Sequence, residues 1–193
     1  MRKLVVVEFV TLDGVMQGLG SPDEDRDGGF EHGGWSAPYF DDVQGAAAVE
    51  GLKSTTAYIF GRRTYEKMLA YWPSQPDENP MAAHLNATPK YLATRTLSSL
   101  TWSNAHVLAG ELVPAVQDLK AQSEGNIVVL GSGVLVQELI ANDLVDGYCL
   151  FVHPLLLGTG KRLFREMDRP RRLRLVDCTP TTTGVLMLTY DSV

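Results

Sequence analysis

Three short segments contain the residue types that proteins use to hold phosphate. They are Gly61-Arg62-Arg63-Thr64, Thr94-Arg95-Thr96 and Gly131-Ser132-Gly133. Guanidinium groups, hydroxyls and the free amides at a helix start all bind phosphate oxygens. Each segment alone has a simpler alternative, a solvated loop or a bare tight turn, because short glycine motifs recur by chance. Their chemistry becomes specific if the fold brings them together.

Each of these segments follows a run that is typical of a short buried strand. The runs are 56–60, 90–94 and 126–131, and helical patterns follow at 61–72 and 133–143. Further strands are predicted at 4–10, 104–108, 145–156, 173–179 and 184–190, and further helices at 41–54 and 112–122. This alternation predicts an α/β fold with a mostly parallel central sheet flanked by helices. The last two strands have no helix between them, so the sheet must end antiparallel.

Ligands bind at the carboxyl ends of the strands in such sheets, which is where the three segments fall. A standard Rossmann motif does not fit them. Its glycines follow the first strand and end in a third glycine, whereas here the motif comes late and Val136 stands at the third position. In that motif an acid about 20 residues later hydrogen-bonds the ribose hydroxyl. Here Phe151 and its neighbours occupy that place and are apolar. A dinucleotide bound here must be held in another way.

The composition predicts an ordinary soluble protein with a single domain over residues 1–193. The formal charge is −6 and the pI about 5.2, which argues against nucleic-acid binding. There is no secretory signal and no apolar stretch long enough to span a membrane, so we expect a cytoplasmic protein. Cys149 and Cys178 lack metal-type spacing and are expected to be buried free thiols. The histidines form no pair, and no metal site is expected.

Several motifs resemble the dihydrofolate reductase fold. TLDGVMQG (11–18), FGRRTYE (60–66) and GVLMLTY (184–190) are similar to segments of that family, and VDGYCLFVHPLLLGTGKRLF (145–164) is the most specific match. Over nearly its whole length the chain is most similar to the reductase domain of the bifunctional riboflavin-biosynthesis deaminase/reductase and its stand-alone relatives.

The resemblance implies NADPH as the cofactor. It implies that Arg62, Thr64, Thr94 and Arg95 surround the adenosine 2′-phosphate, and that Met16 lies against the nicotinamide. Basic residues at the ribose site also favour a 2′-phosphate on chemical grounds, since acids would favour NAD. The other predicted cofactor-binding residues are those around the pyrophosphate and the helix starts: Gly61, Arg63, Gly131, Ser132, Gly133, Val134 and Leu135.

Asp41 and Asp13 are the candidate catalytic carboxylates, with water as the alternative proton source. Folate reductases carry Trp-x-x-Pro-x-Asp before the helix that follows the long loop, and here Phe40 takes the place of that acid. Asp41 is one residue on and would point about 100° away around a helix, so folate activity is in doubt. The alternative is that the helix starts later, in which case Asp41 could serve as that acid. The alternative role of Asp13 is to fix a turn with Gly14.

The sequence therefore predicts an NADPH-dependent reductase that passes hydride to a small heterocycle. It would be similar to the 5-amino-6-(5-phosphoribosylamino)uracil reductase of riboflavin biosynthesis. The alternatives are a dihydrofolate or pterin reductase and a non-catalytic nucleotide- or pterin-binding relative. A homodimer is also expected. The segment YCLFVHPLLL (148–157) is apolar on both faces near the antiparallel end of the sheet, where one face can be exposed to solvent, so a partner chain would explain the pattern by covering it.

Overall fold

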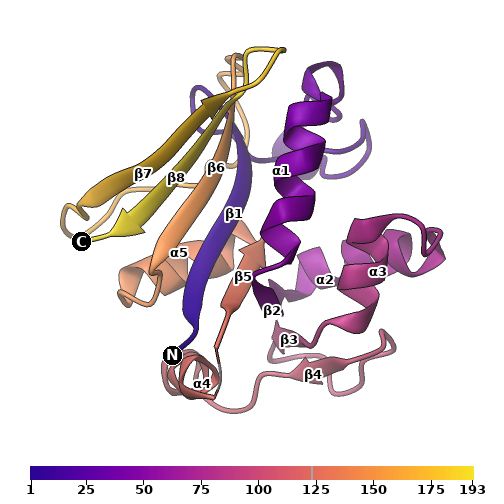
Figure 1. Cartoon of the computed structure of the whole chain (residues 1–193), viewed down its shortest axis with the longest axis vertical. Coiled ribbons are helices and arrows are strands. Elements are labelled where there is room, and N and C mark those ends of the chain that lie inside the picture. Colours follow the sequence, from indigo (N-terminus) through magenta and orange to yellow (C-terminus); the bar gives the residue numbers. More distant parts are fainter. Residues whose placement is uncertain (123) are drawn as a thin grey trace.

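An eight-stranded sheet forms the centre of the computed structural model, which describes residues 1–122 and 124–193 (Figure 1). Its strands lie in the order β4-β3-β2-β5-β1-β6-β8-β7. Neighbours are parallel from β4 to β6, whereas β8 is antiparallel to both β6 and β7. The predicted fold class is therefore confirmed. The strands are β1 (Lys3–Thr11), β2 (Thr55–Gly61), β3 (Lys90–Ala93), β4 (Ala105–Val107), β5 (Asn126–Leu130), β6 (Gly147–His153), β7 (Leu173–Pro180) and β8 (Leu186–Ser192).

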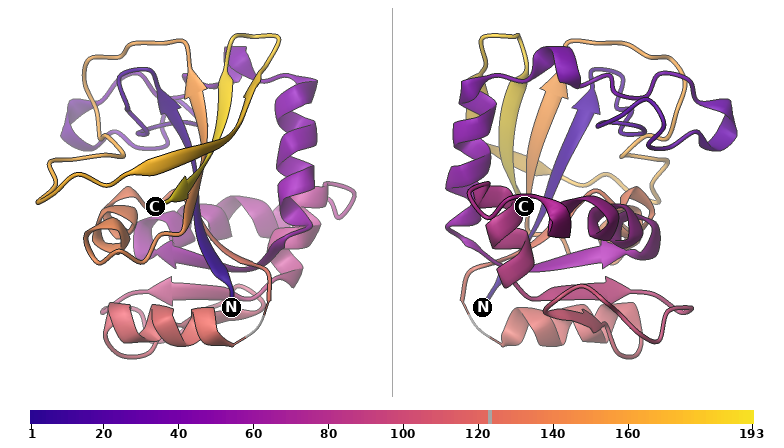
Figure 2. Two further views of the ribbon diagram at one scale, coloured as in Figure 1. Left: turned by 60° about the vertical axis from the view of Figure 1, so that its left-hand side comes forward. Right: turned by 90° about the vertical axis from the view of Figure 1, so that its right-hand side faces the viewer.

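Helices cover both faces of the sheet (Figure 2). They are α1 (Asp42–Leu52), α2 (Arg62–Tyr71), α3 (Pro80–Ala87), α4 (Leu112–Ala121) and α5 (Gly133–Ala141). Strand side chains alternate between the faces, so Leu4 and Val6 pack with α4 and α5 while Val7 and Phe9 pack with α1. A third cluster buries residues of α2 and α3 against β2 and β3. None of the helices in the described part of the chain is long and apolar enough to cross a membrane.

Helix α3 lies in a segment for which the sequence patterns predicted no helix. Its start is nevertheless encoded locally. Asn79 accepts hydrogen bonds from the amides of Met81 and Ala82, and Pro80 occupies the first helical turn, where a missing N–H costs nothing. At the other end of the helix the ammonium of Lys90 donates to Leu85 O and Thr88 O.

The long segment between β1 and α1 has its own small core and two 3₁₀ turns, at Asp27–Gly29 and Ala37–Tyr39. The buried Gln17 organises it, because its amide donates to Asp25 O and Asp27 O and its oxygen accepts from the amide of Lys161. The indole of Trp35 donates to Gln17 O. The segment is therefore a packed loop that is hydrogen-bonded to the chain after β6.

Strand β6 is covered on both faces within one chain. Tyr148 and Leu150 lie in the α4/α5 cluster, and Phe151 packs with Val185 and Met187. The apolar character of this strand thus needs no partner chain to explain it. The exposed apolar side chains at this end of the sheet belong instead to β7 and the start of β8: Leu173, Leu175, Val176 and Leu186.

Both cysteines are free, but the expectation that both are buried was wrong. Cys149 on β6 is half-buried, and burial raises the pKa of its thiol. Cys178 is exposed, because β7 is the outermost strand of the sheet and its residues are largely uncovered.

Candidate functional site

The parallel strands β3, β2, β5 and β1 are neighbours, so their carboxyl ends meet at one edge of the sheet. A cleft of about 2280 Å³ includes this edge and extends to residues at the starts of β2 and β5. Its volume exceeds the roughly 300–1,000 Å³ of a single small-molecule pocket. Every predicted cofactor-binding residue borders this cleft: Met16, Gly61, Arg62, Arg63, Thr64, Thr94, Arg95, Gly131, Ser132, Gly133, Val134 and Leu135.

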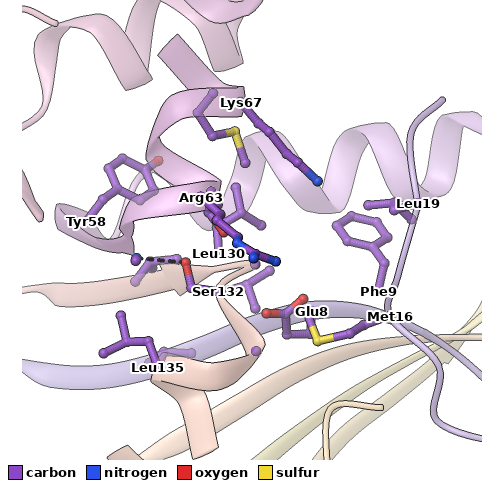
Figure 3. Close-up of a pocket in the computed structure, with 18 of the residues that line it drawn as sticks. Glu8, Phe9, Met16, Leu19, Tyr58, Arg63, Lys67, Leu130, Ser132 and Leu135 are labelled. Carbon is purple, nitrogen blue, oxygen red and sulfur yellow. Dashed lines mark hydrogen bonds between the residues drawn. The ribbon is translucent and has the colours of Figure 1, made fainter. Parts of the chain in front are cut away.

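A tight turn at Gly131 and Ser132 connects β5 to α5. Both residues have left-handed backbone angles, with φ of 70° and 65°, which is unusual for the serine. The Ser132 hydroxyl accepts a hydrogen bond of 3.0 Å from the amide of Gly61, shown as a dashed line in Figure 3. This bond joins the ends of β5 and β2. Because Ser132 does not cap α5 with its side chain, the amides of the first turn keep their capacity to bind an anion.

Glycine keeps this turn free of side chains where neighbours are close. A Cβ added at Gly131 would lie 3.0 Å from the Thr64 methyl group, and one at Gly133 would lie 2.5 Å from the Met16 sulfur. Both contacts are tighter than ordinary van der Waals distance. The turn therefore presents backbone to the cleft and brings Met16 from the long loop against the start of α5.

The basic residues of the cleft are partly engaged in exposed ion pairs. Arg62 donates to Glu66 one helical turn on, and Arg63 pairs with Asp27 of the long loop. Asp27 also accepts from Lys161, and these two hydrogen bonds lower the pKa of the Asp27 carboxyl. Exposed pairs of this kind contribute little to stability, so an arriving phosphate competes with them at small cost.

Asp13 holds a turn rather than bordering the cleft. It accepts hydrogen bonds from the Thr11 hydroxyl (2.5 Å) and from the amides of Leu157 (3.3 Å) and Gly158 (2.8 Å), and it faces Arg162. These hydrogen bonds, that of Thr11 first, lower the pKa of Asp13 to about 2. Asp13 is therefore an ionised group that ties the end of β1 to the loop after β6.

Asp41 is the N-cap of α1. Its carboxylate accepts from the amide of Gln44 (2.9 Å) and from the hydroxyl (2.6 Å) and amide (2.7 Å) of Thr182. The hydroxyl of Thr182 is the main cause of its lowered pKa. Neither Asp41 nor Asp13 is among the described residues that border the cleft, whereas Phe40 is. A catalytic role for either carboxylate stays a prediction, and their hydrogen bonds favour a structural one.

Sequence reasoning missed Glu8, which borders the cleft from the middle of β1 (Figure 3). It is buried, and among the described residues its Oε1 atom has no hydrogen-bond partner. Burial raises the pKa of its carboxyl well above the usual range. The available signal in the sequence was a lone acid inside the apolar run LVVVEFV.

The described residues contain no group of three His, Cys, Asp or Glu that could hold a metal ion.

A family model described as "RibD C-terminal domain" matches residues 2–187. The chain belongs to the RibD C-terminal domain family. This RibD C-terminal domain protein is 24% identical to the uncharacterized protein YyaP of Bacillus subtilis (strain 168), a match that covers 98% of this chain and 94% of YyaP.

Two solved structures extend the comparison. The protein is similar to a putative riboflavin biosynthesis protein from Shewanella sp. PV-4, with a TM-score of 0.76, 19% identity and 99% of each chain covered. It is also similar to a dihydrofolate reductase from Enterococcus faecalis complexed with NADP(H) and RAB-propyl, with a TM-score of 0.62, 15% identity, and 98% of this chain and 96% of that one covered. The dihydrofolate reductase-like fold of this RibD C-terminal domain protein is thereby confirmed.

Proposed function

We propose that this protein is an NADPH-dependent reductase that transfers hydride to a small heterocyclic substrate, similar to the 5-amino-6-(5-phosphoribosylamino)uracil reductase of riboflavin biosynthesis. One observation carries the proposal. Phosphate-binding residue types from three strand ends, far apart in the sequence, border a single cleft. Membership of the RibD C-terminal domain family supports it.

The residues present fit a dinucleotide with a 2′-phosphate. Arg62 and Arg95, with the hydroxyls of Thr64 and Thr94, would hold the 2′-phosphate through charge-assisted hydrogen bonds. The pyrophosphate would lie at the start of α5, against the amides of Gly133, Val134 and Leu135. The Ser132 hydroxyl accepts from the Gly61 amide, so its own hydrogen remains available to a phosphate oxygen. A Cβ at residue 131 or 133 would crowd this space.

When bound, NADPH supplies a hydride to a carbon of the substrate. The protein contributes a cleft with large apolar side chains on its lining, among them Phe9, Leu19, Phe40 and Phe151. Such walls exclude water and suit a flat heterocycle. For the accompanying proton, the hydrogen bonds that keep Asp13 and Asp41 ionised favour water over either carboxylate.

The decisive experiment compares NADPH and NADH binding by calorimetry. Arg62→Ala and Arg95→Ala should each weaken NADPH roughly tenfold or more, because a charge-assisted hydrogen bond contributes about 1.5–3 kcal/mol, and should leave NADH nearly unchanged. Arg174→Ala is the matched control, since it removes an exposed, ion-paired arginine of β7 outside the cleft lining. Equal losses for both cofactors would contradict the assignment of the 2′-phosphate site.

Turnover separates a reductase from a binding relative. We expect loss of NADPH absorbance when the wild-type protein is given an aminopyrimidine substrate, and little or none with dihydrofolate. If the protein binds NADPH tightly but oxidises it with none of a panel of pyrimidines and pterins, the result would support the non-catalytic alternative.

A further inference from the structure

Glu8 lies where β1 runs on beyond the end of β5. Val7 is paired in register with Leu130, the last residue of β5, and Glu8 is paired only on its other side, with Leu150 of β6. Beyond Leu130 the chain turns away through Gly131–Gly133 into α5. Glu8 therefore has no neighbouring strand on the β5 side, and the cleft that Leu130 and the turn at Gly131–Gly133 border reaches Glu8 there.

The Glu8 carboxyl borders this cleft with no hydrogen-bond partner among the described residues. The residue is only 4% exposed, and among the described residues no group hydrogen-bonds its Oε1 atom. Three of the basic side chains that border the same cleft face other carboxylates: Lys67 and Lys161 face Asp25, and Arg63 faces Asp27. A buried polar atom without a partner destabilises a fold, so such an atom at a cleft wall points to a ligand that supplies the missing hydrogen bond.

The chemistry of this carboxyl narrows the kind of ligand. Burial raises the pKa of Glu8 well above the usual range, so the side chain favours its neutral form. A neutral carboxylic acid carries one O–H donor and one carbonyl acceptor. Its complement is a group with an acceptor and a donor side by side, and a primary carboxamide is such a group.

We propose that Glu8 hydrogen-bonds the carboxamide of a nicotinamide ring bound in the cleft, an inference that rests on the proposed function. The position of Glu8 supports it. With the 2′-phosphate near β3 and β2 and the pyrophosphate at the end of β5, the next strand along this edge is β1. At β1 the cleft is bordered by Glu8, Phe9 and Met16. The nicotinamide end of the cofactor therefore reaches Glu8, and the carboxamide is its hydrogen-bonding group.

The test uses two ligands that differ only at the nicotinamide end. NADP⁺ and 2′-phospho-ADP-ribose share the 2′-phosphate and the pyrophosphate, but the second lacks the carboxamide. Their dissociation constants are measured for wild type, Glu8→Gln, Glu8→Leu and the control Glu138→Gln, which neutralises an exposed acid on the same cleft. Thermal melting is recorded for each variant.

Glu8→Leu should weaken NADP⁺ about tenfold, as expected for the loss of two hydrogen bonds, and leave 2′-phospho-ADP-ribose unchanged. Glu8→Gln should retain NADP⁺ affinity within about threefold, because its amide also offers a donor beside an acceptor. Glu138→Gln should affect both ligands equally. Glu8→Leu should not lower the melting temperature, since it removes a polar atom that has no partner.

Two outcomes overturn the proposal. One is NADP⁺ affinity that Glu8→Leu leaves unchanged, and the other is an equal loss for both ligands, which marks a role in the fold. Failure of the proposed function gives a different result. In that case the wild-type protein binds neither ligand, whereas failure of the Glu8 proposal alone leaves both bound.

Discussion

Asp13→Asn is the substitution that best separates a structural carboxylate from a catalytic one. Asparagine keeps the size of the side chain and one acceptor oxygen but loses the charge. In the wild-type protein the carboxylate accepts from two backbone amides and one hydroxyl, and Arg162 lies 3.4 Å away. If these contacts are its function, the substitution lowers the stability of the fold.

The magnitude follows from the pKa. The fall from 3.8 to about 2 corresponds to about 2.4 kcal/mol, at about 1.36 kcal/mol for each pH unit. The side chain is 18% exposed and near the surface, and solvent screening reduces this to about 1–2 kcal/mol. For a chain of 193 residues we therefore expect the melting temperature to fall by about 2–8 °C.

The sign of the pH dependence is fixed by the same shift. A carboxyl whose folded pKa is depressed stabilises the fold above its unfolded pKa, and this contribution is lost as the pH falls from about 4 towards 2. Urea denaturation at pH 7 and at pH 3 measures it. The gap in unfolding free energy between wild type and Asp13→Asn should be smaller at pH 3. An unchanged urea midpoint at pH 7, together with a hundredfold loss of kcat in folded protein, would refute the structural interpretation.

Two further predictions concern the cleft and the assembly. Gly133→Val should weaken NADPH binding at least tenfold, because its side chain enters the space proposed for the pyrophosphate. The protein should still fold, because the backbone of residue 133 is helical and the new Cβ meets only the flexible end of Met16. Unchanged affinity would argue against phosphate binding at the Gly131–Gly133 turn. Light scattering should give the mass of a homodimer at micromolar concentration, with the exposed apolar side chains of β7 buried between the two copies. A monomer mass would count against this interface. So would a dimer that persists when Leu175 and Val176 are replaced by lysine.

Much of the fold was predictable because its signals are local. The strands at 56–60 and 126–131 agree with β2 and β5 to within a residue, since apolar runs of this kind end where a glycine and a helix start follow. The strand predicted to reach residue 156 ends at His153, because Pro154 has no N–H to continue the ladder. Connections between alternating strands and helices are short and right-handed, so the three segments with phosphate-binding residue types were expected at the same edge of the sheet.

The roles of individual carboxyl groups were decided only by the tertiary structure. Asp13 finds a partner amide 145 residues away in Gly158, and Asp41 finds its hydroxyl partner 141 residues away in Thr182. Glu8 borders the cleft at a level where β5 has already ended, one residue short of it. The sequence by itself determined which residues follow each strand, because that depends on neighbours in the chain. Whether an acid is paired, buried or exposed to a ligand depends on segments that only folding brings together, and so only the tertiary structure decided it.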